Sequence, residues 1–348
     1  MKIGNFDFNS NSTLIIAEVS ANHNHDINIM RDTLIAIKES GADCVKIQTY
    51  TPDTITIDCD KEDFIIKNSS LWNDQKLYDL YREAYTPWEW HKEIFKLAAN
   101  LELICFSSPF DFTSVDFLES FDVPAYKIAS FEITDINLIK YVASKKKPII
   151  ISTGIAEKKD IELAIQSCRS VGNNDIILLK CTSSYPSSLE DANLRMIDQY
   201  HNDFNLITGL SDHTLGDICP IVAVSLGARV IEKHFILNKN LESPDSKFSL
   251  DKIEFKRMVN KIRDVEKSLG NIDYSLKENQ QKSRQFSRSL YIVKDIKKGE
   301  KFNDKNVRSI RPGFGLHPKF LKQILGKESN VDLEKGTRFD LKFIKTNK

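Results

Sequence analysis

The sequence predicts an α/β fold, a (β/α)8 TIM barrel followed by a small C-terminal domain. Three observations carry this prediction. Eight short apolar runs recur over about the first 270 residues, helix-like segments separate them, and most runs end in a cluster of Ser, Thr, Lys, His or Glu. Parallel strands covered on both faces read as near-continuous apolar runs. Eight of them can close into a barrel, whose chemistry sits at the C-terminal strand ends.

The expected strands are residues 14–19, 44–47, 103–106, 125–128, 149–151, 176–179, 206–210 and 229–231. In the first expected helix, Ile27, Met30, Leu34 and Ile37 recur at helical spacing, and Gly41 follows as a stop. The expected helices are 26–40, 87–100, 111–120, 135–144, 158–171, 189–200, 217–226 and 250–269. Strands that alternate with helices through short links favour the barrel.

One link is long. Residues 51–85 form a segment of about 35 residues with several aromatic side chains. Such a segment is either an insertion with its own small core or a lid over the barrel mouth. Composition then changes after Gly270, so we expect a barrel domain at 1–270, a polar linker at 271–288 and a small domain at 289–348. The small domain should hold strands at 289–293 and 307–310 and a short helix at 319–325.

Bulk composition excludes several classes of protein. Apolar residues make up 41% and charged residues 28% of the 348 residues, as in an ordinary soluble globular protein. Lys and Arg number 49, as do Asp and Glu, so no basic excess points to nucleic acid or a membrane surface. No apolar stretch is long enough to span a bilayer, and the N-terminus lacks a signal-peptide core. Six cysteines without a Cys-x-x-Cys pair fit reduced, buried thiols of a cytoplasmic protein.

Two histidines stand at neighbouring strand ends. His213 and His234 follow the seventh and eighth expected strands, and adjacent strand ends of a barrel lie close together. Two converging imidazoles suit Mn, Zn, Fe or Co and leave coordination positions open for a substrate oxygen. The alternative is two unrelated, hydrogen-bonded histidines.

Four lysines interrupt or follow buried strands: Lys46, Lys127, Lys180 and Lys233. Lysine is almost never buried without a partner, so an anionic group must compensate each one. A phosphate or carboxylate ligand would do so, and strand-end hydroxyl groups could join it, namely those of Ser108, Ser130, Ser152, Thr153 and Ser183. The alternative is a set of internal salt bridges with Glu18, Glu132 or Glu232, which we expect for one or two of the lysines.

Further polar residues fall at the same rim. Glu18 and Glu132 could hold a sugar hydroxyl, act as acid or base, or pair with a lysine. Gln48 and Tyr185 fit hydroxyl recognition. Asp245 lies in a loop after the eighth strand, and exposed acids in such loops are usually only solvated. Arg311, in a Gly/Pro-containing turn of the small domain, reads on its own as a surface arginine.

The order of these motifs resembles the sialic acid synthase family, in which phosphoenolpyruvate condenses with an N-acetylated sugar to give a nonulosonic acid. The matching strings are Ile16-Ala17-Glu18 with Asn22-His23, Gly41-Ala42-Asp43-Cys44-Val45-Lys46-Ile47-Gln48, Ser107-Ser108-Pro109-Phe110, Pro124-Ala125-Tyr126-Lys127-Ile128-Ala129-Ser130, Ser152-Thr153-Gly154, Gly209-Leu210-Ser211-Asp212-His213-Thr214 and Glu232-Lys233-His234-Phe235. Lys297-Lys298-Gly299-Glu300 and Arg311-Pro312-Gly313 resemble its C-terminal antifreeze-like (SAF) domain.

Within that family the chain resembles the pseudaminic acid synthase branch. Ser20 and His25 stand where sialate synthases usually carry glycine. Strings that also look like the branch are Thr49-Tyr50-Thr51-Pro52-Asp53, Tyr85-Thr86-Pro87-Trp88-Glu89-Trp90-His91 and Phe314-Gly315-Leu316-His317-Pro318-Lys319. The resemblance implies the sugar 2,4-diacetamido-2,4,6-trideoxy-L-altrose, with N-acetylneuraminate or legionaminate synthesis as the alternative.

The resemblance also implies roles for individual residues. His213 and His234 would hold a divalent metal, most simply Mn2+, with Mg2+ or Co2+ as alternatives. Phosphoenolpyruvate would be held by Lys46, Ser108, Lys127, Ser130, Ser152, Ser183 and Ser211. The sugar would face Glu18, which would be catalytic with the two histidines, and Gln48, Glu132, Tyr185 and Asp245. The family is a domain-swapped homodimer, so Arg311 would reach into the other subunit.

The implied reaction joins C3 of phosphoenolpyruvate to the metal-polarised aldehyde carbon, and phosphate leaves by C–O cleavage after water adds at C2. Two rival functions follow from the residues alone. A Schiff-base aldolase or lyase would use Lys127 or Lys180 as its nucleophile. A non-catalytic carbohydrate-binding protein would bind ligand without releasing phosphate.

Overall fold

The structure is a computed structural model that describes residues 1–67 and 71–346. Residues 68–70 of the expected insertion and the last two residues of the expected C-terminal domain lie outside the described residues. The chain divides into two compact units, Met1–Gly270 and Asn271–Lys348. Each unit is described by itself.

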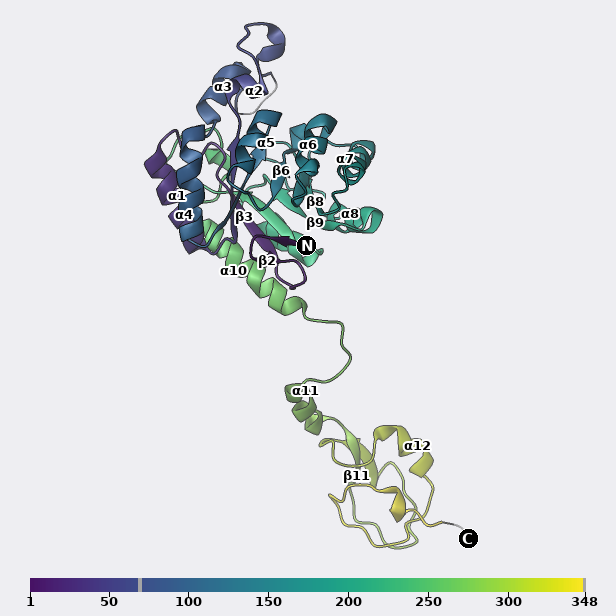
Figure 1. Ribbon diagram of the computed structural model, residues 1–348. Helices are drawn as coiled ribbons and strands as arrows, with labels where there is room; N and C mark the ends of the chain where they lie inside the picture. Colours follow the sequence, from purple (N-terminus) through teal and green to yellow (C-terminus); the bar gives the residue numbers. More distant parts are fainter. Residues whose placement is uncertain (68–70, 347–348) are drawn as a thin grey trace. The chain divides into compact units, whose positions relative to one another are not determined.

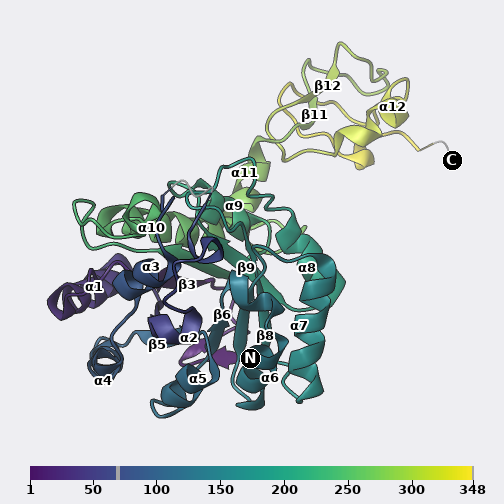
Figure 2. The same ribbon diagram turned by 90° about the horizontal axis from the view of Figure 1, so that it is seen from above.

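Eight parallel strands close the barrel of the first unit, in the order β10-β3-β4-β5-β6-β7-β8-β9 (Figures 1 and 2). The prediction of a (β/α)8 barrel is therefore confirmed. The strands are β3 (Leu14–Glu18), β4 (Cys44–Thr49), β5 (Ile104–Pro109), β6 (Tyr126–Ile128), β7 (Ile149–Ser152), β8 (Ile176–Cys181), β9 (Ile207–Asp212) and β10 (Val230–His234). Several strands run further than their apolar runs, so polar residues expected after a strand belong to it.

Helices surround the strands in the view of Figure 2. They are α1 (Ile27–Ser40), α4 (His91–Asn100), α5 (Phe112–Glu119), α6 (Ile136–Ser144), α7 (Lys158–Ser170), α8 (Met196–Phe204), α9 (Ile218–Ser225) and α10 (Lys252–Leu269). The Asp26 side chain caps α1 by accepting a hydrogen bond from the Asn28 amide. Gly41 ends α1 with a φ of 85°, a conformation that favours glycine, as the sequence predicted.

The helix expected at 189–200 is wrong at both ends, because α8 begins at Met196 and continues to Phe204. Local hydrogen bonds hold the preceding residues in a loop. The Ser188 hydroxyl donates to the Asp191 carboxylate at 2.9 Å, and Asn193 has a φ of 41° that a helix cannot continue. The sequence pattern showed the apolar spacing but not this competing turn.

A small antiparallel hairpin precedes the barrel and was not predicted. Its strands, β1 (Lys2–Ile3) and β2 (Phe6–Asp7), are too short to show a periodicity. Ile3 and Phe8 pack with Leu14 inside the barrel, so the hairpin closes its N-terminal end with apolar side chains. At the opposite end in Figure 1, the 51–85 segment carries α2 (Pro52–Ile55) and α3 (Leu77–Ala84).

Side chains alternate along each barrel strand, and this alternation decides which polar residues share the barrel interior. On β10, Val230 belongs to the apolar cluster inside the barrel, whereas Ile231 packs in the cluster shared with the outer helices. Glu232 and His234 therefore point inward, and Lys233 points outward between them. The same rule places Lys46 and Lys127 inside and Lys180 outside.

Lys233 is neutralised in that outer layer. Its side chain is fully buried and its ammonium lies 2.5 Å from Asp212 Oδ2 on the neighbouring strand β9. It also donates to the Thr214 carbonyl. Lys180 donates to the Cys181 carbonyl at 2.6 Å and to Thr182 Oγ1 at 3.0 Å. Lys180 and Lys233 are thus satisfied by protein groups other than the three glutamates of the salt-bridge alternative. The salt bridges that this alternative expected with Glu18 and Glu232 are made instead by Lys46 and Lys127.

The second unit has its own apolar core. Strands β11 (Ser289–Ile292) and β12 (Val307–Ile310) pair antiparallel, and α12 (Leu321–Ile324) follows. Leu290, Phe302 and Phe339 are among the buried residues of its core. The stretch expected to be a plain linker contains a short helix, α11 (Glu278–Ser283), because Gln280 caps the Lys277 amide.

Two further expectations concern the whole chain. All six cysteines are unpaired, and five of them are buried. Within the described ranges, each helix is too short or too polar to cross a membrane.

We predict that Lys233→Met destabilises the chain by about 3–5 kcal/mol, because Asp212 would keep a buried charge without its partner. The free energy of unfolding in urea measures this. Lys267→Met is the matched control, since the Lys267–Asp264 pair is exposed on both sides and should contribute less than about 1 kcal/mol. Equal losses in the two variants would contradict the structural role of Lys233.

Candidate active site

A cavity of about 430 Å3 opens at the C-terminal ends of the barrel strands. It gathers twelve of the residues singled out in the sequence, from seven strands or the loops after them. They are Glu18, Lys46, Gln48, Lys127, Ser130, Glu132, Ser152, Tyr185, Ser211, His213, His234 and Asp245. Ser108 is buried beside the cavity and accepts from Lys46 Nζ at 3.4 Å. The expected convergence on one rim is therefore present.

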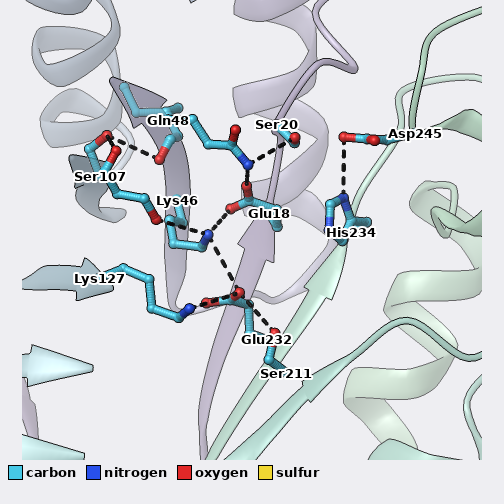
Figure 3. Close-up of polar contacts among 12 residues, drawn as sticks. Glu18, Ser20, Lys46, Gln48, Ser107, Lys127, Ser211, Glu232, His234 and Asp245 are labelled. Atoms are coloured by element: carbon cyan, nitrogen blue, oxygen red, sulfur yellow. Dashed lines mark hydrogen bonds and ion pairs between the residues drawn. The ribbon is translucent and has the colours of Figure 1, made fainter. Parts of the chain in front are cut away.

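Two buried lysines and two buried glutamates form the base of this cavity, here called the ionic layer (Figure 3). Lys46 Nζ lies 2.8 Å from Glu18 Oε2 and 3.4 Å from Glu232 Oε1. Lys127 Nζ lies 3.9 Å from the same Glu232 oxygen. The register explains the first pair, because Glu18 of β3 stands opposite Lys46 of β4.

Burial and the attraction of neighbouring ammonium groups have opposite effects on a carboxyl pKa, and the balance differs between the two glutamates of the ionic layer. Burial raises the pKa of Glu18 above its ordinary value despite the attraction of Lys46. Glu232 is equally buried, yet the Lys127 and Lys46 ammonium groups hold its pKa below the ordinary value. Burial lowers the pKa of Lys127. Glu232 thus holds its negative charge between two cations, and Lys127 holds its proton less firmly than a free lysine.

Gln48 connects the ionic layer to the upper cavity. Its amide donates to Glu18 Oε1 at 2.9 Å and to Ser20 Oγ at 3.0 Å (Figure 3). These bonds fix the Glu18 carboxylate between a cation below and an amide above. A carboxylate held in this way can receive a hydroxyl group from the cavity without moving.

A cluster of serine hydroxyls borders the cavity beside Lys127. The Gly154 amide donates to Ser130 Oγ at 3.1 Å. A Cβ at Gly154 would approach the Ser183 and Ser130 hydroxyl oxygens to 2.1 and 2.7 Å, so only glycine lets these two serines come together. Ser152 Oγ is buried and makes no hydrogen bond. Ser183 does not line the main cavity but adjoins it through this cluster.

Buried polar atoms without partners mark the cavity as a site that a ligand completes. Native proteins rarely leave such atoms unsatisfied. Glu132 Oε2, Ser152 Oγ and His234 Nδ1 all border the cavity and all lack a hydrogen bond. A carboxylate, a hydroxyl and an imidazole nitrogen together favour a ligand that carries both hydroxyl and anionic groups.

The two histidines face each other across the upper cavity, with ring centroids 5.4 Å apart. His213 Nδ1 lies 3.0 Å from the Thr182 carbonyl oxygen, which favours the tautomer protonated on Nδ1 and leaves Nε2 as an electron-pair donor. Burial lowers the pKa of His234 well below its ordinary value, so this ring is neutral. Asp245 Oδ2 lies 3.6 Å from His234 Nδ1.

The two imidazole rings could bind a metal ion as two ligands, leaving its other coordination positions open. Within residues 1–67 and 71–346, no three His, Cys, Asp or Glu side chains are grouped as a metal site. Cys181 and the Thr182 carbonyl raise the pKa of His213 despite its burial, so this ring binds a proton more firmly than His234 does. Two imidazole donors with open positions nevertheless fit a divalent ion that also binds substrate. Mg2+ prefers oxygen ligands, so a pair of imidazole nitrogens suits a transition-metal ion better.

Three of the expected site residues lie elsewhere. Lys180 and Lys233 point out of the barrel and bind protein groups, for the reason given by strand alternation. Arg311 lies exposed in the second unit, next to Pro312.

Glu232 forms ion pairs with both lysines of the ionic layer, as the salt-bridge alternative expected, and it also lines the cavity, which the sequence analysis did not predict. The sequence contained a signal for this position. Glu232 lies two residues before His234 on the same strand, so both side chains point to the same side of the sheet.

The 51–85 segment, expected to be either an insertion with its own small core or a lid over the barrel mouth, borders the cavity. Seven of its described residues line the cavity: Ile55, Ile66, Trp72, Leu77, Leu80, Tyr81 and Ala84. The Trp72 ring lies 5.7 Å from that of Tyr185. Much of the apolar surface of the segment therefore faces the same space as the ionic layer.

Comparisons with known proteins agree with this geometry. The family model of the NeuB family matches residues 34–274, and that of the SAF domain matches residues 287–339. Pseudaminic acid synthase of Campylobacter jejuni strain 81-176 is 52% identical over 336 residues, 97% of each chain. Pseudaminic acid synthase of Helicobacter pylori strain 26695 is 50% identical over 324 residues, 93% of this chain and 95% of that one.

A more distant relative and a solved structure extend the comparison. N,N'-diacetyllegionaminic acid synthase of Legionella pneumophila is 36% identical and covers 94% of this chain and 93% of its own. The crystal structure of N-acetylneuraminic acid (sialic acid) synthetase from Leptospira borgpetersenii, in complex with citrate, aligns with a TM-score of 0.72 at 27% identity. It covers 81% of this chain and 94% of that chain. The barrel, its strand-end site and both family models thus lead to one conclusion: the chain belongs to the NeuB family.

Proposed function

We propose that the chain condenses phosphoenolpyruvate with 2,4-diacetamido-2,4,6-trideoxy-L-altrose and water, giving pseudaminic acid and phosphate. The observation that carries the proposal is the ionic layer, with its two buried ammonium groups, in one cavity with two imidazoles. The relatives at about 50% identity that are named pseudaminic acid synthase support the choice of sugar.

Phosphoenolpyruvate suits the lower part of the cavity. Lys46 and Lys127 offer two cations for its phosphate and carboxylate. The hydroxyl groups of Ser108, Ser130, Ser152, Ser183 and Ser211 surround them. Ser211 already donates to Glu232 at 3.2 Å, so it can turn to an anionic oxygen when one arrives. An anion bound here competes with Glu18 and Glu232 for the two ammonium groups and accepts charge-assisted hydrogen bonds from them.

The sugar suits the upper part. Glu18, Gln48, Glu132, Tyr185 and Asp245 border it and offer acceptors and donors for hydroxyl and acetamido groups. We further propose a homodimer in which the exposed Arg311 of each chain completes the sugar site of the other. An exposed arginine in a SAF domain would otherwise have no evident role in the site.

His213 and His234 would hold a divalent metal, most simply Mn2+. That metal, when bound, supplies Lewis acidity toward the aldehyde oxygen of the open-chain sugar. The two lysines and the serines hold phosphoenolpyruvate so that its C3 meets the aldehyde carbon in a near-attack geometry. As the C3–C1 bond forms, the aldehyde oxygen takes up a proton and becomes a hydroxyl group, while water adds to C2 and gives up a proton. The bond between C2 and the oxygen of the phosphate ester then breaks, and its electron pair leaves with phosphate. The new C2 hydroxyl gives its proton to that phosphate, so C2 becomes a ketone.

A second candidate is a Schiff-base aldolase. One observation favours it, since Lys127 lines the cavity and burial lowers its pKa, which activates an amine as a nucleophile. Lys180 does not qualify, because it points out of the barrel. The Glu232 carboxylate at 3.9 Å from Lys127 favours the charged, ligand-holding form and hence the first proposal.

We predict phosphate release from phosphoenolpyruvate and the altrose derivative with Mn2+, faster than with N-acetylmannosamine or the legionaminic acid precursor. With 18O in the bridging position of phosphoenolpyruvate, mass spectrometry should find the label in the phosphate, because the C–O bond breaks. Ligand binding without phosphate release would support a carbohydrate-binding protein instead.

We predict that His213→Ala lowers this turnover on the order of 100-fold or more while the circular dichroism spectrum is unchanged. His201→Ala, a change on the outer helix α8, is the control and should keep wild-type turnover. Near-normal turnover of His213→Ala in metal-free buffer would remove the metal from the mechanism.

We predict that borohydride with pyruvate leaves the chain without a covalent adduct, as measured by intact mass. An adduct lost in Lys127→Met but kept in Lys180→Met would establish the aldolase and refute the synthase.

Glu132 gives a prediction of pH dependence. Burial raises its pKa from the usual 4.5 to about 7. The folded chain therefore binds this proton more tightly than the unfolded chain, and the resulting stability is lost as pH rises through about 7. We expect the stability of Glu132→Gln relative to wild type to increase between pH 4.5 and 7, by up to about 3 kcal/mol. Above pH 7 the difference in the free energy of unfolding should stay constant. Urea unfolding at each pH measures it, with Glu83→Gln as the matched control. A gain that is equal at all pH values would contradict the raised pKa.

A further inference from the structure

Helix α3 (Leu77–Ala84) turns one apolar face toward the cavity. Leu77, Leu80, Tyr81 and Ala84 recur at i, i+3, i+4 and i+7, and all four line the cavity. We call them the α3 stripe. On another face of the helix, Arg82 pairs with Asp79 at 2.8 Å. An amphipathic helix normally covers a core with its apolar face, whereas this one borders a space that also contains the ionic layer.

The α3 stripe is held by a firm apolar wall. The Tyr81 ring packs on Tyr50 at 5.8 Å, and Tyr50 packs on Phe110 at 5.1 Å. Before α3, the Ile66 amide donates to the Gln75 carbonyl at 2.9 Å, and the Asp74 amide donates to the Ile66 carbonyl at 2.8 Å. This pairing places Ile66 beside the stripe on the cavity wall. The wall therefore has a defined shape rather than only an apolar composition.

The cavity is thus divided by chemistry. Its base carries charges and its strand-end rim carries hydroxyl, carboxylate and imidazole groups, whereas the described lining residues of the 51–85 segment are all aliphatic or aromatic and uncharged. The aliphatic side chains of this wall, those of Ile55, Ile66, Leu77, Leu80 and Ala84, leave a sugar hydroxyl that meets them without a hydrogen bond, which costs free energy. Methyl groups that meet them are removed from water at a gain.

We propose that the α3 stripe selects the sugar by receiving its methyl groups, namely the C6 methyl and the methyl of the acetamido group at C4. This inference rests on the proposed function and adds to it the residues that determine specificity. A 6-deoxy sugar with two acetamido groups offers methyl groups where N-acetylmannosamine offers hydroxyl groups at C4 and C6. The stripe therefore favours the former, and the ionic layer, which binds phosphoenolpyruvate, does not discriminate between them.

The test is Leu77→Asn, a change of similar size that places an amide in the stripe. We expect kcat/KM for the altrose derivative to fall about 10- to 200-fold, the range that a lost apolar contact gives. The value for N-acetylmannosamine should change less than about threefold, and the KM for phosphoenolpyruvate should stay within about twofold. Leu163→Asn, an exposed leucine on helix α7, is the matched control and should leave both sugars unchanged.

Ala84→Ser provides a second variant that adds only a hydroxyl group, in case Leu77→Asn does not fold. It should lower the ratio of the two kcat/KM values in the same direction by a smaller factor. An unchanged ratio in a folded stripe variant, or equal losses with both sugars, overturns the inference while the synthase activity stands. A wild-type chain that releases no phosphate with any of the sugars overturns the proposed function, and the inference with it.

Discussion

The site depends on a buried network of ion pairs between two lysines and two glutamates inside the barrel. Taking an ion out of water costs several kcal/mol, and only close partners can offset that cost. Lys46 and Lys127 share Glu232, and Lys46 also holds Glu18. Removing any one of these four groups would leave another charge buried without compensation. The ionic layer therefore constrains the residues on four strands at once.

This layer lies directly above a purely apolar one. Leu14, Phe106 and Ile150 belong to the cluster that fills the lower barrel, and the N-terminal hairpin closes it below. Water is thus excluded from beneath the charges and can reach them only through the cavity. Low polarity on one side strengthens each electrostatic contact, and a ligand can reach the two ammonium groups only from the open side.

Reactivity and selection come from different parts of the chain. The barrel strands supply the charges, hydroxyls and imidazoles at their ends, where the closed sheet fixes their spacing. The 51–85 segment supplies an apolar wall on the same cavity, and the residues that line it from the described parts of this segment (51–67 and 71–85) are uncharged. A wall that stands apart from the reacting groups can change which sugar fits while the charge pattern below stays the same.

The sequence by itself determined the barrel, its eight strands, most of its helices and the identity of most residues around the cavity, because apolar period and polar strand ends are local signals. The predicted barrel already implied that His213 lies close to His234, because their strands are neighbours. The register between β3 and β4 then sets Lys46 opposite Glu18. The tertiary structure alone decided that Lys180 and Lys233 turn outward, that Glu232 joins two lysines, and that α8 begins at Met196. There are two physical reasons. Which side of a strand faces the barrel interior depends on how the barrel closes. Whether local side-chain hydrogen bonds displace a helix depends on the neighbours that the fold provides.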